Sequence, residues 1–273
     1  MPFGFDGAAD RAARAFARAA GADIAIENVP GEGGLAGVRR ANALAAAEEP
    51  VLLLATPSTH VLLPARMGPE AAPAATLLPL AGLGFAPNVL LASARLGVCD
   101  VAALVLRARA GRLVYASAGT GQTIHLCTAL FCRQAGIAME HRPYAAGSAS
   151  AYEDLRAGRV HVYFDNVLAC REAIAAGDVV PLAVSARERS PLLPAVPTLA
   201  ECGFAHALDI WFGVFGGGLG ASAAARIAAS PDDDMLASAL ETIGLRAGPV
   251  DGAALARIVE SSAQAWLAAL AAA

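Results

Sequence analysis

Short apolar runs alternate with amphipathic stretches along the whole chain, and this pattern predicts strands that alternate with helices. The run 51–55 is typical of a buried strand, and 22–28 places Ile24 and Ile26 at alternate positions, as a half-buried strand does. Strands are predicted at 22–28, 51–55, 89–92, 113–115, 138–142, 160–164, 179–185 and 210–215. Helices are predicted at 10–20, 33–47, 100–109, 121–134, 150–157 and 167–176, and over most of the last 50 residues.

The order of these elements indicates an α/β fold. Strands joined to helices by short connections predict βαβ units and mostly parallel sheets. A chain of 273 residues has room for two domains of ordinary size or one large one. Local signals support single elements: Asp10 and Arg14 form a favourable helical pair, and Ser150 with Glu153 has the spacing of a capping box.

Three polar loops rich in Gly, Ser and Thr stand before predicted helices, at 4–8, 56–60 and 117–123. In open α/β sheets ligands bind at the carboxyl ends of strands, and free amides at a helix start attract anions. The loops therefore predict a site for a small carboxylate or phosphate. Asp165 also ends a predicted strand, where a carboxylate meets a ligand or caps the helix that follows.

Composition excludes several classes of function. All 20 basic residues are Arg, so a P-loop lysine and a Schiff-base lysine are absent. The net charge of −4 offers no basic field for nucleic acid. No apolar run reaches the ~18–20 residues of a spanning helix. The printed N-terminus has neither the charged nor the apolar region of a signal peptide, and five scattered cysteines predict buried free thiols rather than disulfides.

Three other chemistries have partial signals. The segment Gly31 to Ala36 fits G-x-G-x-x-A, which is typical of dinucleotide binding or of a plain strand-to-helix turn. His125, Cys127 and Cys132 share one segment, but their spacing matches no known zinc pattern. Ser117 is a candidate nucleophile, with Ser58 and with His60 or His125, although no G-x-S-x-G elbow is present. We therefore expect no metal, no cofactor and no catalysis.

A set of ordered motifs resembles the Bug substrate-binding proteins of tripartite tricarboxylate transporters. The residues 115–126 read YASAGTGQTIHL and are similar to the family signature YASAGxGxxxHL. The family-like segments, in chain order, are IENVPGEGG at 26–34, ATPSTH at 55–60, PNVL at 87–90, PY at 143–144, FDN at 164–166, RSPLLPAVPT at 189–198 and WFGVF at 211–215.

This resemblance implies two Rossmann-like α/β domains in the type II periplasmic-binding-protein fold, with the ligand in the interdomain cleft. Domain one would comprise 1–92 and 211–273, and domain two 93–210. The ligand would be an organic acid or amino acid, with Asp165 at its variable end. The implied ligand-binding residues are Phe5, Gly7, Ala8, Thr56, Ser58, Thr59, Ser117, Gly119, Thr120, Gly121, Tyr144 and Asp165.

The resemblance further implies a periplasmic, monomeric receptor that works with membrane transporter subunits. The alternative is a cytoplasmic or orphan ligand-binding or regulatory module of the same fold, as a divergent or truncated member. Two departures from the family pattern matter. The printed sequence starts almost at the first loop, which predicts a gap where the family has its first strand. Asp6 occupies the place of a family glycine, where a carboxylate would repel an anionic ligand.

Overall fold

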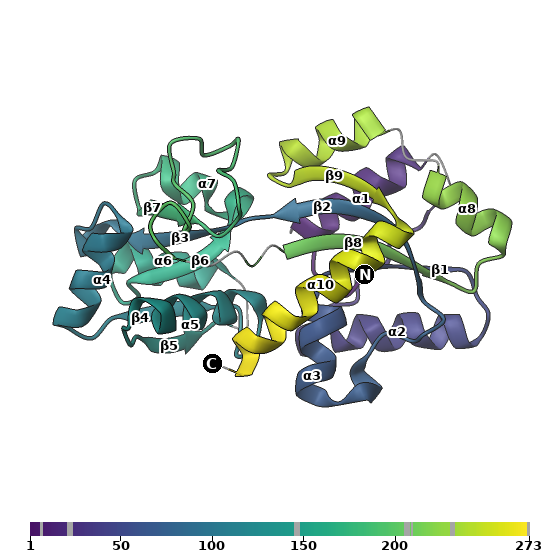
Figure 1. Cartoon of the computed structure of the whole chain (residues 1–273), viewed down its shortest axis with the longest axis horizontal. Coiled ribbons are helices and arrows are strands. Elements are labelled where there is room, and N and C mark those ends of the chain that lie inside the picture. Colours follow the sequence, from purple (N-terminus) through teal and green to yellow (C-terminus); the bar gives the residue numbers. More distant parts are fainter. Residues whose placement is uncertain are drawn as a thin grey trace. The chain divides into compact units, whose positions relative to one another are not determined.

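The computed structural model describes residues 1–5, 8–20, 24–144, 148–204, 208, 210–229 and 233–271. The chain divides into two compact units. Unit 1 comprises Met1–Ala86 and Ile210–Leu267, and unit 2 comprises Pro87–Asp209 with Ala268–Ala273. Unit 1 is thus formed from the two ends of the chain, purple to blue and green to yellow in Figure 1, and most of unit 2 from the middle.

The sheet of unit 1 has four strands in the order β1-β8-β2-β9. They are β1 (Val51–Ala55), β8 (Ile210–Gly217), β2 (Leu78–Ala86) and β9 (Arg246–Asp251). β8 lies between β1 and β2 and is antiparallel to both. β2 is in turn antiparallel to β9, so all three pairings of this sheet are antiparallel. The prediction of a mostly parallel sheet is wrong here, and β2 and β9 were not predicted. Glycine and proline interrupt both of these strands, which hides their apolar pattern.

Helices and short turns complete unit 1. The helices are α1 (Ala8–Ala19), α2 (Leu35–Ala46), α3 (Leu63–Met67), α8 (Ala221–Ala229), α9 (Asp233–Thr242) and α10 (Gly252–Ala271), with short helical turns at Glu32–Gly34, Ser58–Leu62 and Pro69–Ala71. In α1 the predicted pair forms, with 2.9 Å between Arg14 Nε and Asp10 Oδ2. A core cluster joins Ala41 of α2, Leu53 of β1 and Leu255 of α10.

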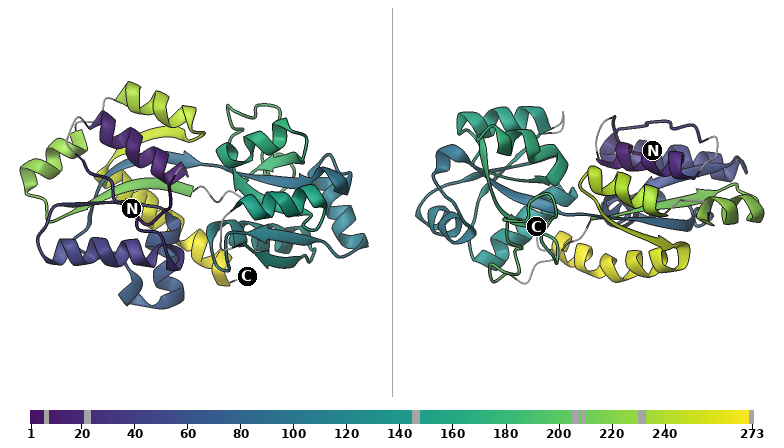
Figure 2. Two further views of the ribbon diagram at one scale, coloured as in Figure 1. Left: turned by 180° about the vertical axis from the view of Figure 1, so that it is seen from behind. Right: turned by 90° about the horizontal axis from the view of Figure 1, so that it is seen from above.

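The segment 24–30 is not a strand, contrary to prediction. Its ribbon runs between α1 and α2 without a strand arrow (Figure 2). A strand needs a ladder partner on at least one side, and within the described residues the backbone of this segment pairs only with Met1. The Met1 amine donates to the Glu27 carbonyl at 2.6 Å, and the Val29 amide donates to the Met1 carbonyl at 2.8 Å. The alternation of Ile24 and Ile26 is therefore not sufficient to make this segment a strand in the described structure.

The sheet of unit 2 has five strands in the order β5-β4-β6-β3-β7. They are β5 (Glu140–Pro143), β4 (Val114–Ser117), β6 (Val162–Asn166), β3 (Asn88–Ser93) and β7 (Val179–Val184). β4 is parallel to β5 and β6, whereas β3 is antiparallel to β6 and β7, so this sheet is mixed. β3 is buried along its whole length between its two partners. The first boundary between the units therefore precedes β3, at 86/87, and not at the expected 92/93.

Four helices and one short turn belong to the described part of unit 2. They are α4 (Val101–Ala110), α5 (Thr123–Ala135), α6 (Ser148–Ala157) and α7 (Val167–Ala175), with a short turn at Ala94–Leu96. The Asp100 carboxylate accepts the Ala103 amide at 2.7 Å at the start of α4. The predicted capping box at Ser150 is wrong, because α6 has already begun at Ser148. Among the described residues, no helix is both long and apolar enough to cross a membrane.

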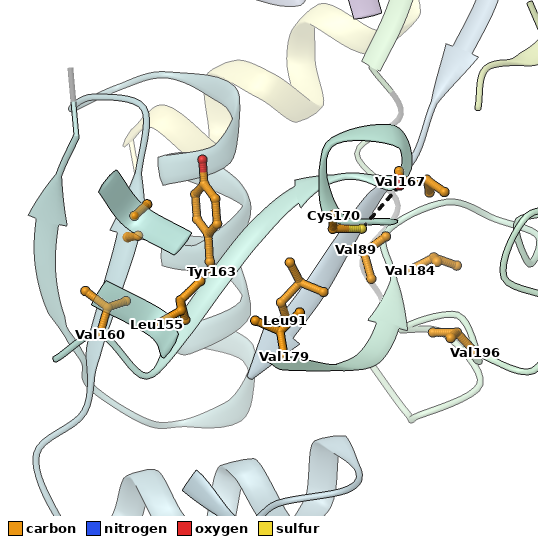
Figure 3. Close-up of a cluster of buried hydrophobic side chains, with 12 residues drawn as sticks. Val89, Leu91, Leu155, Val160, Tyr163, Val167, Cys170, Val179, Val184 and Val196 are labelled. Carbon is orange, nitrogen blue, oxygen red and sulfur yellow. Dashed lines mark hydrogen bonds between the residues drawn. The ribbon is translucent and has the colours of Figure 1, made fainter. Parts of the chain in front are cut away.

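An apolar cluster fills the space between the sheet of unit 2 and its helices. Figure 3 shows Val89 and Leu91 of β3 close to Val179 and Val184 of β7, with Tyr163 and Leu155 farther along the cluster. All five cysteines are free, and the expectation of buried thiols holds for three of them: Cys127, Cys132 and Cys170 are buried, Cys202 is half-buried and Cys99 is exposed. Burial raises the pKa of the Cys127 thiol to about 12, which keeps it protonated.

Candidate functional site

The parallel strands β5, β4 and β6 of unit 2 each have a residue of interest at or directly after the carboxyl end. Ser117 at the end of β4 lies opposite Pro143 of β5, which directly precedes Tyr144. Ala116 lies opposite Tyr163 of β6, two residues before Asp165. The register therefore places Tyr144, the loop that starts at Ser117, and Asp165 at the same end of the sheet, where the three strands have their carboxyl ends. Ligands of open α/β sheets bind at this end.

The Ser117 side chain braces the loop that follows β4. Its Oγ accepts the Gly119 amide at 3.1 Å and lies 3.2 Å from the Gly119 carbonyl and 2.6 Å from Nε2 of His141 on β5. The Tyr144 amide donates to the Ser117 carbonyl at 2.8 Å. Ser117 is fully buried. Its hydroxyl thus fixes the loop from inside, and it supports a ligand site by shaping the backbone around it.

The glycines of this loop adopt conformations that other residues avoid. Gly119 has φ of 144° and Gly121 has φ of 71°. The Gly121 amide donates to Nδ1 of His125 at 3.1 Å, so the ring of His125 holds the loop against the first turn of α5. Gln122 precedes the helix and provides no side-chain cap. Thr120 is exposed at the tip of the loop. The first amides of α5 and their positive dipole end are therefore left without a capping side chain.

Two histidines and a tyrosine stack behind the loop. The rings of Tyr115 and His141 lie 4.9 Å apart, and those of His125 and His141 lie 4.3 Å apart. Burial lowers the pKa of His141, so its ring is held neutral. The sequence singled out His125 as a metal ligand or base, but missed His141. The pairing of β5 with β4 brings His141 to Ser117. No short motif in the sequence indicates this contact.

The carboxylate of Asp165 is buried in unit 2, with 5% of the residue exposed. Oδ2 accepts the Tyr152 hydroxyl at 3.0 Å and Oδ1 accepts the Asn166 amide at 2.8 Å. Burial raises the pKa of Asp165 to about 6, and these two hydrogen bonds oppose the rise. The helix cap belongs to the next residue, since Asn166 Oδ1 accepts the Ala169 amide at 2.9 Å. The capping role considered for Asp165 is therefore wrong.

Tyr144 is half-buried and its hydroxyl is already engaged. It donates to Oδ2 of Asp154 on α6 at 2.5 Å. Asp154 also contacts the guanidinium groups of Arg142 and Arg159. These cations and the tyrosine hydroxyl hold the pKa of the Asp154 carboxyl below its ordinary value. A contact of Tyr144 with a ligand is therefore expected from its ring and not from its hydroxyl.

In unit 1 the loop after β1 is held by hydrogen bonds between its own residues. Thr59 Oγ1 accepts the Thr56 amide at 3.2 Å and donates to the Thr56 carbonyl at 3.1 Å. Thr56 and Thr59 are both buried, whereas Ser58 between them is half-buried. Gly34 packs against the same loop, where an added Cβ would lie 3.1 Å from Thr59 Cγ2. Of the three residues of this loop that are predicted to bind ligand, Ser58 is therefore the one with the most exposed surface.

His60 follows this loop and is packed among aromatic rings. Its ring lies 4.1 Å from that of Phe215 and 5.8 Å from that of Trp211. Nδ1 is 3.3 Å from Thr59 Oγ1, and Nε2 is a buried nitrogen without a hydrogen-bond partner in the described part of the chain. Burial lowers the pKa of His60 to about 3. It is therefore neutral at neutral pH and packs against aromatic rings.

Only part of the first predicted loop is described. Phe5 is largely exposed, and Ala8 is buried at the start of α1. Gly7, a predicted ligand residue, and Asp6, whose carboxylate was expected to repel an anion, lie outside the described residues.

The geometry does not support the alternative chemistries. Within the described ranges, no three His, Cys, Asp or Glu side chains are grouped as metal ligands. The Gly31 to Ala36 segment is a structural turn with no strand before it. The contact between Ser117 and His141 resembles a nucleophile–base pair, but the serine is fully buried and bonded to Gly119. Among the described residues, no carboxylate contacts His141 to orient it.

Comparison with known proteins agrees with this description. The model of the tripartite tricarboxylate transporter family receptor matches residues 8–220. A protein in the tcbD-tcbE intergenic region of Pseudomonas sp. strain P51 is 31% identical over 97% of this chain and 82% of its own length. Protein BugT of Bordetella pertussis is 33% identical over 78% of this chain and 68% of its own length.

Solved structures share the fold. Rpa4515 of R. palustris, solved with adipate, has a TM-score of 0.82 at 29% identity and covers all of this chain and 95% of its own. MatC of Rhodopseudomonas palustris, solved with malate, has a TM-score of 0.81 at 25% identity, covering 99% of this chain and 97% of its own. The periplasmic binding protein BugD has a TM-score of 0.81 at 23% identity and covers 97% of this chain and 93% of its own, so the two α/β units have the fold of periplasmic binding proteins. The chain belongs to the tripartite tricarboxylate transporter receptor family.

Proposed function

We propose that this protein is an extracytoplasmic receptor that binds a small carboxylate for a tripartite tricarboxylate-type transporter. The observation that carries the proposal is the 117–123 loop. Its backbone is fixed by the bonds of Ser117 and His125, and the start of α5 has no side-chain cap. Preorganised amides at a helix start suit a carboxylate, and they need no lysine. Two relatives were solved with dicarboxylates, adipate and malate.

The residues proposed to contact the ligand divide into three roles. Gly119, Thr120 and Gly121 present backbone amides to the carboxylate, with Ser117 as the brace behind them. Tyr144 adds a ring at the same edge of the sheet. In unit 1 the corresponding contributions come from Phe5, Gly7, Ala8, Thr56 and Thr59, with Ser58 as the accessible hydroxyl.

Asp165 is proposed to select the variable end of the ligand. Its carboxylate lies near the carboxyl end of β6, at the same end of the sheet as the 117–123 loop. A buried hydrogen-bond acceptor there favours a ligand with an amine or hydroxyl donor. Because its pKa is raised to about 6, Asp165 is mostly ionised at neutral pH and protonated below that value. Ligands that bear a donor should therefore bind more weakly as the solution is acidified.

The remaining parts of the proposal concern the setting of the protein. We propose that it acts in the periplasm as a monomer, without catalysis and without nucleic acid, and delivers its ligand to membrane subunits. Family membership and the relatives that were solved with organic acids support this setting.

A thermal-shift screen tests the proposal. The purified protein is heated with dicarboxylates, hydroxy acids, amino acids and aromatic acids, each at millimolar concentration. A receptor should be stabilised by at least one group, because a ligand that binds only the folded state raises Tm. A folded protein that is stabilised by none of these compounds would contradict the proposal. Hydrolysis or redox turnover that Ser117→Ala abolishes would favour an enzyme instead.

A further inference from the structure

The loop proposed to bind a carboxylate contains no basic side chain, because residues 117–123 read SAGTGQT. Two histidines brace it instead. Nδ1 of His125 accepts the Gly121 amide at 3.1 Å, and Nε2 of His141 lies 2.6 Å from Ser117 Oγ. Their rings lie 4.3 Å apart. Imidazole gains a proton close to neutral pH, so the loop is held by side chains that a proton can convert into cations.

His125 has to remain neutral for the loop to keep its shape. A protonated imidazole carries hydrogen on both nitrogens, so Nδ1 would no longer accept the Gly121 amide. Two N–H groups would then face each other across 3.1 Å. His125 is also buried, whereas His141 is half-buried and can exchange a proton with solvent. A proton that enters this pair is therefore expected on His141.

His141 can take a proton without loss of the loop contacts. The Ser117 hydroxyl has two acceptors within reach, His141 Nε2 at 2.6 Å and the Gly119 carbonyl at 3.2 Å. When Nε2 is unprotonated, the hydroxyl donates to it. When Nε2 carries a proton, the ring donates to Ser117 Oγ and the hydroxyl turns to the Gly119 carbonyl. In both arrangements the Gly119 amide still donates to Oγ at 3.1 Å.

The rings packed against His141 favour a single positive charge there. Tyr115 of β4 stacks on it with 4.9 Å between the rings, and an aromatic face attracts a cation. Burial raises the pKa of Tyr115 to about 12, so its own hydroxyl stays uncharged. His125 of α5 is so close that a charge on one imidazole repels a charge on the other.

The charged neighbours of His141 on its own strand are already paired. Glu140 contacts Arg112 at 2.9 Å, and Arg142 contacts Asp154 at 3.5 Å. Burial is what lowers the pKa of His141, so the ring is neutral at pH 7. A carboxylate bound at the loop would act in the opposite direction, because a nearby anion favours the protonated imidazole.

We propose that His141 couples ligand binding to protonation: a carboxylate bound at the 117–123 loop draws a proton onto His141, and the imidazolium in turn strengthens binding. This coupling rests on the proposed carboxylate site. By linkage, binding takes up protons, and the contribution of His141 to affinity grows as the pH falls below neutrality. The effect of Asp165 is separate, because it acts on the other end of the ligand.

The first measurement needs no ligand. Nuclear magnetic resonance of the ¹⁵N-labelled histidine rings reports the protonation of each imidazole between pH 8 and pH 5. We expect His141 to gain a proton as the pH falls, while His125 stays neutral with its proton on Nε2. The Gly121 amide should stay protected from hydrogen exchange throughout. Protonation of His125 before His141, or loss of Gly121 protection as His141 is protonated, would overturn the proposal.

The second measurement is calorimetric titration with adipate and malate at pH 7.5 and pH 5.5, in buffers of different ionisation enthalpy. It compares the unaltered protein with His141→Gln, whose amide can contact Ser117 but does not titrate. The unaltered protein should take up more protons on binding. The ratio of its affinity to that of the variant should rise roughly three- to tenfold from pH 7.5 to pH 5.5. Ionisation of the acids themselves affects both proteins equally.

A matched control is His161→Gln. His161 is also half-buried with a pKa lowered by burial, but it accepts the Val114 amide at the opposite end of β4. This variant should keep the proton uptake of the unaltered protein. His141→Asn replaces His141→Gln if the latter does not fold. Binding with the same proton uptake and pH dependence with and without His141 would overturn the coupling alone. Folded samples that bind neither acid at either pH would contradict the carboxylate site, and the coupling with it.

Discussion

Each unit has a loop of the same kind after a strand, but different contacts fix the loop in the two units. In each, a buried strand leads through a Gly-, Ser- or Thr-containing loop into a helical turn, as β4 does before α5 and β1 before Ser58–Leu62. In unit 2 the neighbouring strand supplies His141 to brace the loop, and the sheet has five strands. In unit 1 the loop braces itself through Thr59, and the sheet has four strands.

A loop of the same kind can thus be fixed by contacts that are distant in sequence or by local ones. The unit 2 loop depends on a partner 24 residues away in sequence, Ser117 to His141. The unit 1 loop depends on a hydroxyl three residues away, Thr59 to Thr56. We therefore expect substitutions far away in the sequence to disturb the loop of unit 2 more than the loop of unit 1.

The chain carries separate spectroscopic probes for the two units. Both tryptophans, Trp211 and Trp266, lie in unit 1, and all four tyrosines lie in unit 2. Tryptophan fluorescence therefore follows unfolding of unit 1. Near-ultraviolet tyrosine signals follow unit 2.

The largest expected effect is acid destabilisation of unit 1 through His60. Its pKa is lowered to about 3 in the folded state, so the unfolded state binds the proton first as the pH falls through the ordinary value of 6.5. Stability should fall by about 3 kcal/mol between pH 6.5 and pH 4. Urea unfolding followed by tryptophan fluorescence measures it. His60→Leu should remove most of this dependence, and an unchanged pH profile in that variant would refute the assignment.

The opposite pH dependence is expected in unit 2 from Asp165. Its folded pKa of about 6 is above the ordinary value of 3.8, so the folded state holds the proton more tightly. Its contribution to stability is therefore lost as the pH rises from about 4 to about 6, by about 2–3 kcal/mol. Asp165→Asn should flatten this profile, as seen by tyrosine signals in urea. The variant should also lose preference for ligands that bear an amine or hydroxyl.

A smaller effect compares one serine from each loop. Ser117→Ala leaves the half-buried Gly119 amide without its side-chain partner and should cost about 1–3 kcal/mol of unfolding free energy. Ser58→Ala alters a half-buried hydroxyl and should change stability by less than about 0.5 kcal/mol. Calorimetry should find weaker ligand binding in both variants. Equal stability losses would contradict the contrast between the loops.

The smallest effect separates the helix cap from the binding group. Asn166→Ala removes the cap of α7 and should cost about 1 kcal/mol, with affinity nearly unchanged. Asp165→Ala should instead weaken binding of ligands that bear a donor. If Asn166→Ala lowers affinity as much as Asp165→Ala does, the two roles have been assigned to the wrong residues.

The sequence predicted elements well wherever a local pattern and a complete ladder agree. The helix α5 and the strands β1, β3, β6 and β7 follow their apolar periodicity, and the ordered motifs identified the family. The prediction failed at 22–28, where the described part, 24–28, has strand periodicity but lacks a neighbour. It also failed for β2 and β9, where glycine and proline obscure the alternation, and for strand direction, which depends on the path of β8.

The loops of the candidate site could be predicted from the sequence, but the side chains that hold Ser117 and Asp165 in place could not. Gly119 and Gly121 stand in a motif, and their positive φ angles agree with the glycines there. His141 and Tyr152 act through contacts 24 and 13 residues away, which only the packing of β5 and α6 creates. No short-range signal could have paired Tyr152 with Asp165, because that pairing depends on the position of a whole helix.

The most direct test of the receptor function is isothermal titration calorimetry of the purified protein with adipate and malate, the acids found with its relatives, and with any compound that stabilises it thermally. We predict saturable binding of one molecule per chain by at least one carboxylate, weakened at least tenfold in Ser117→Ala. A folded protein that gives no binding heat with any of these acids at several temperatures would contradict the account.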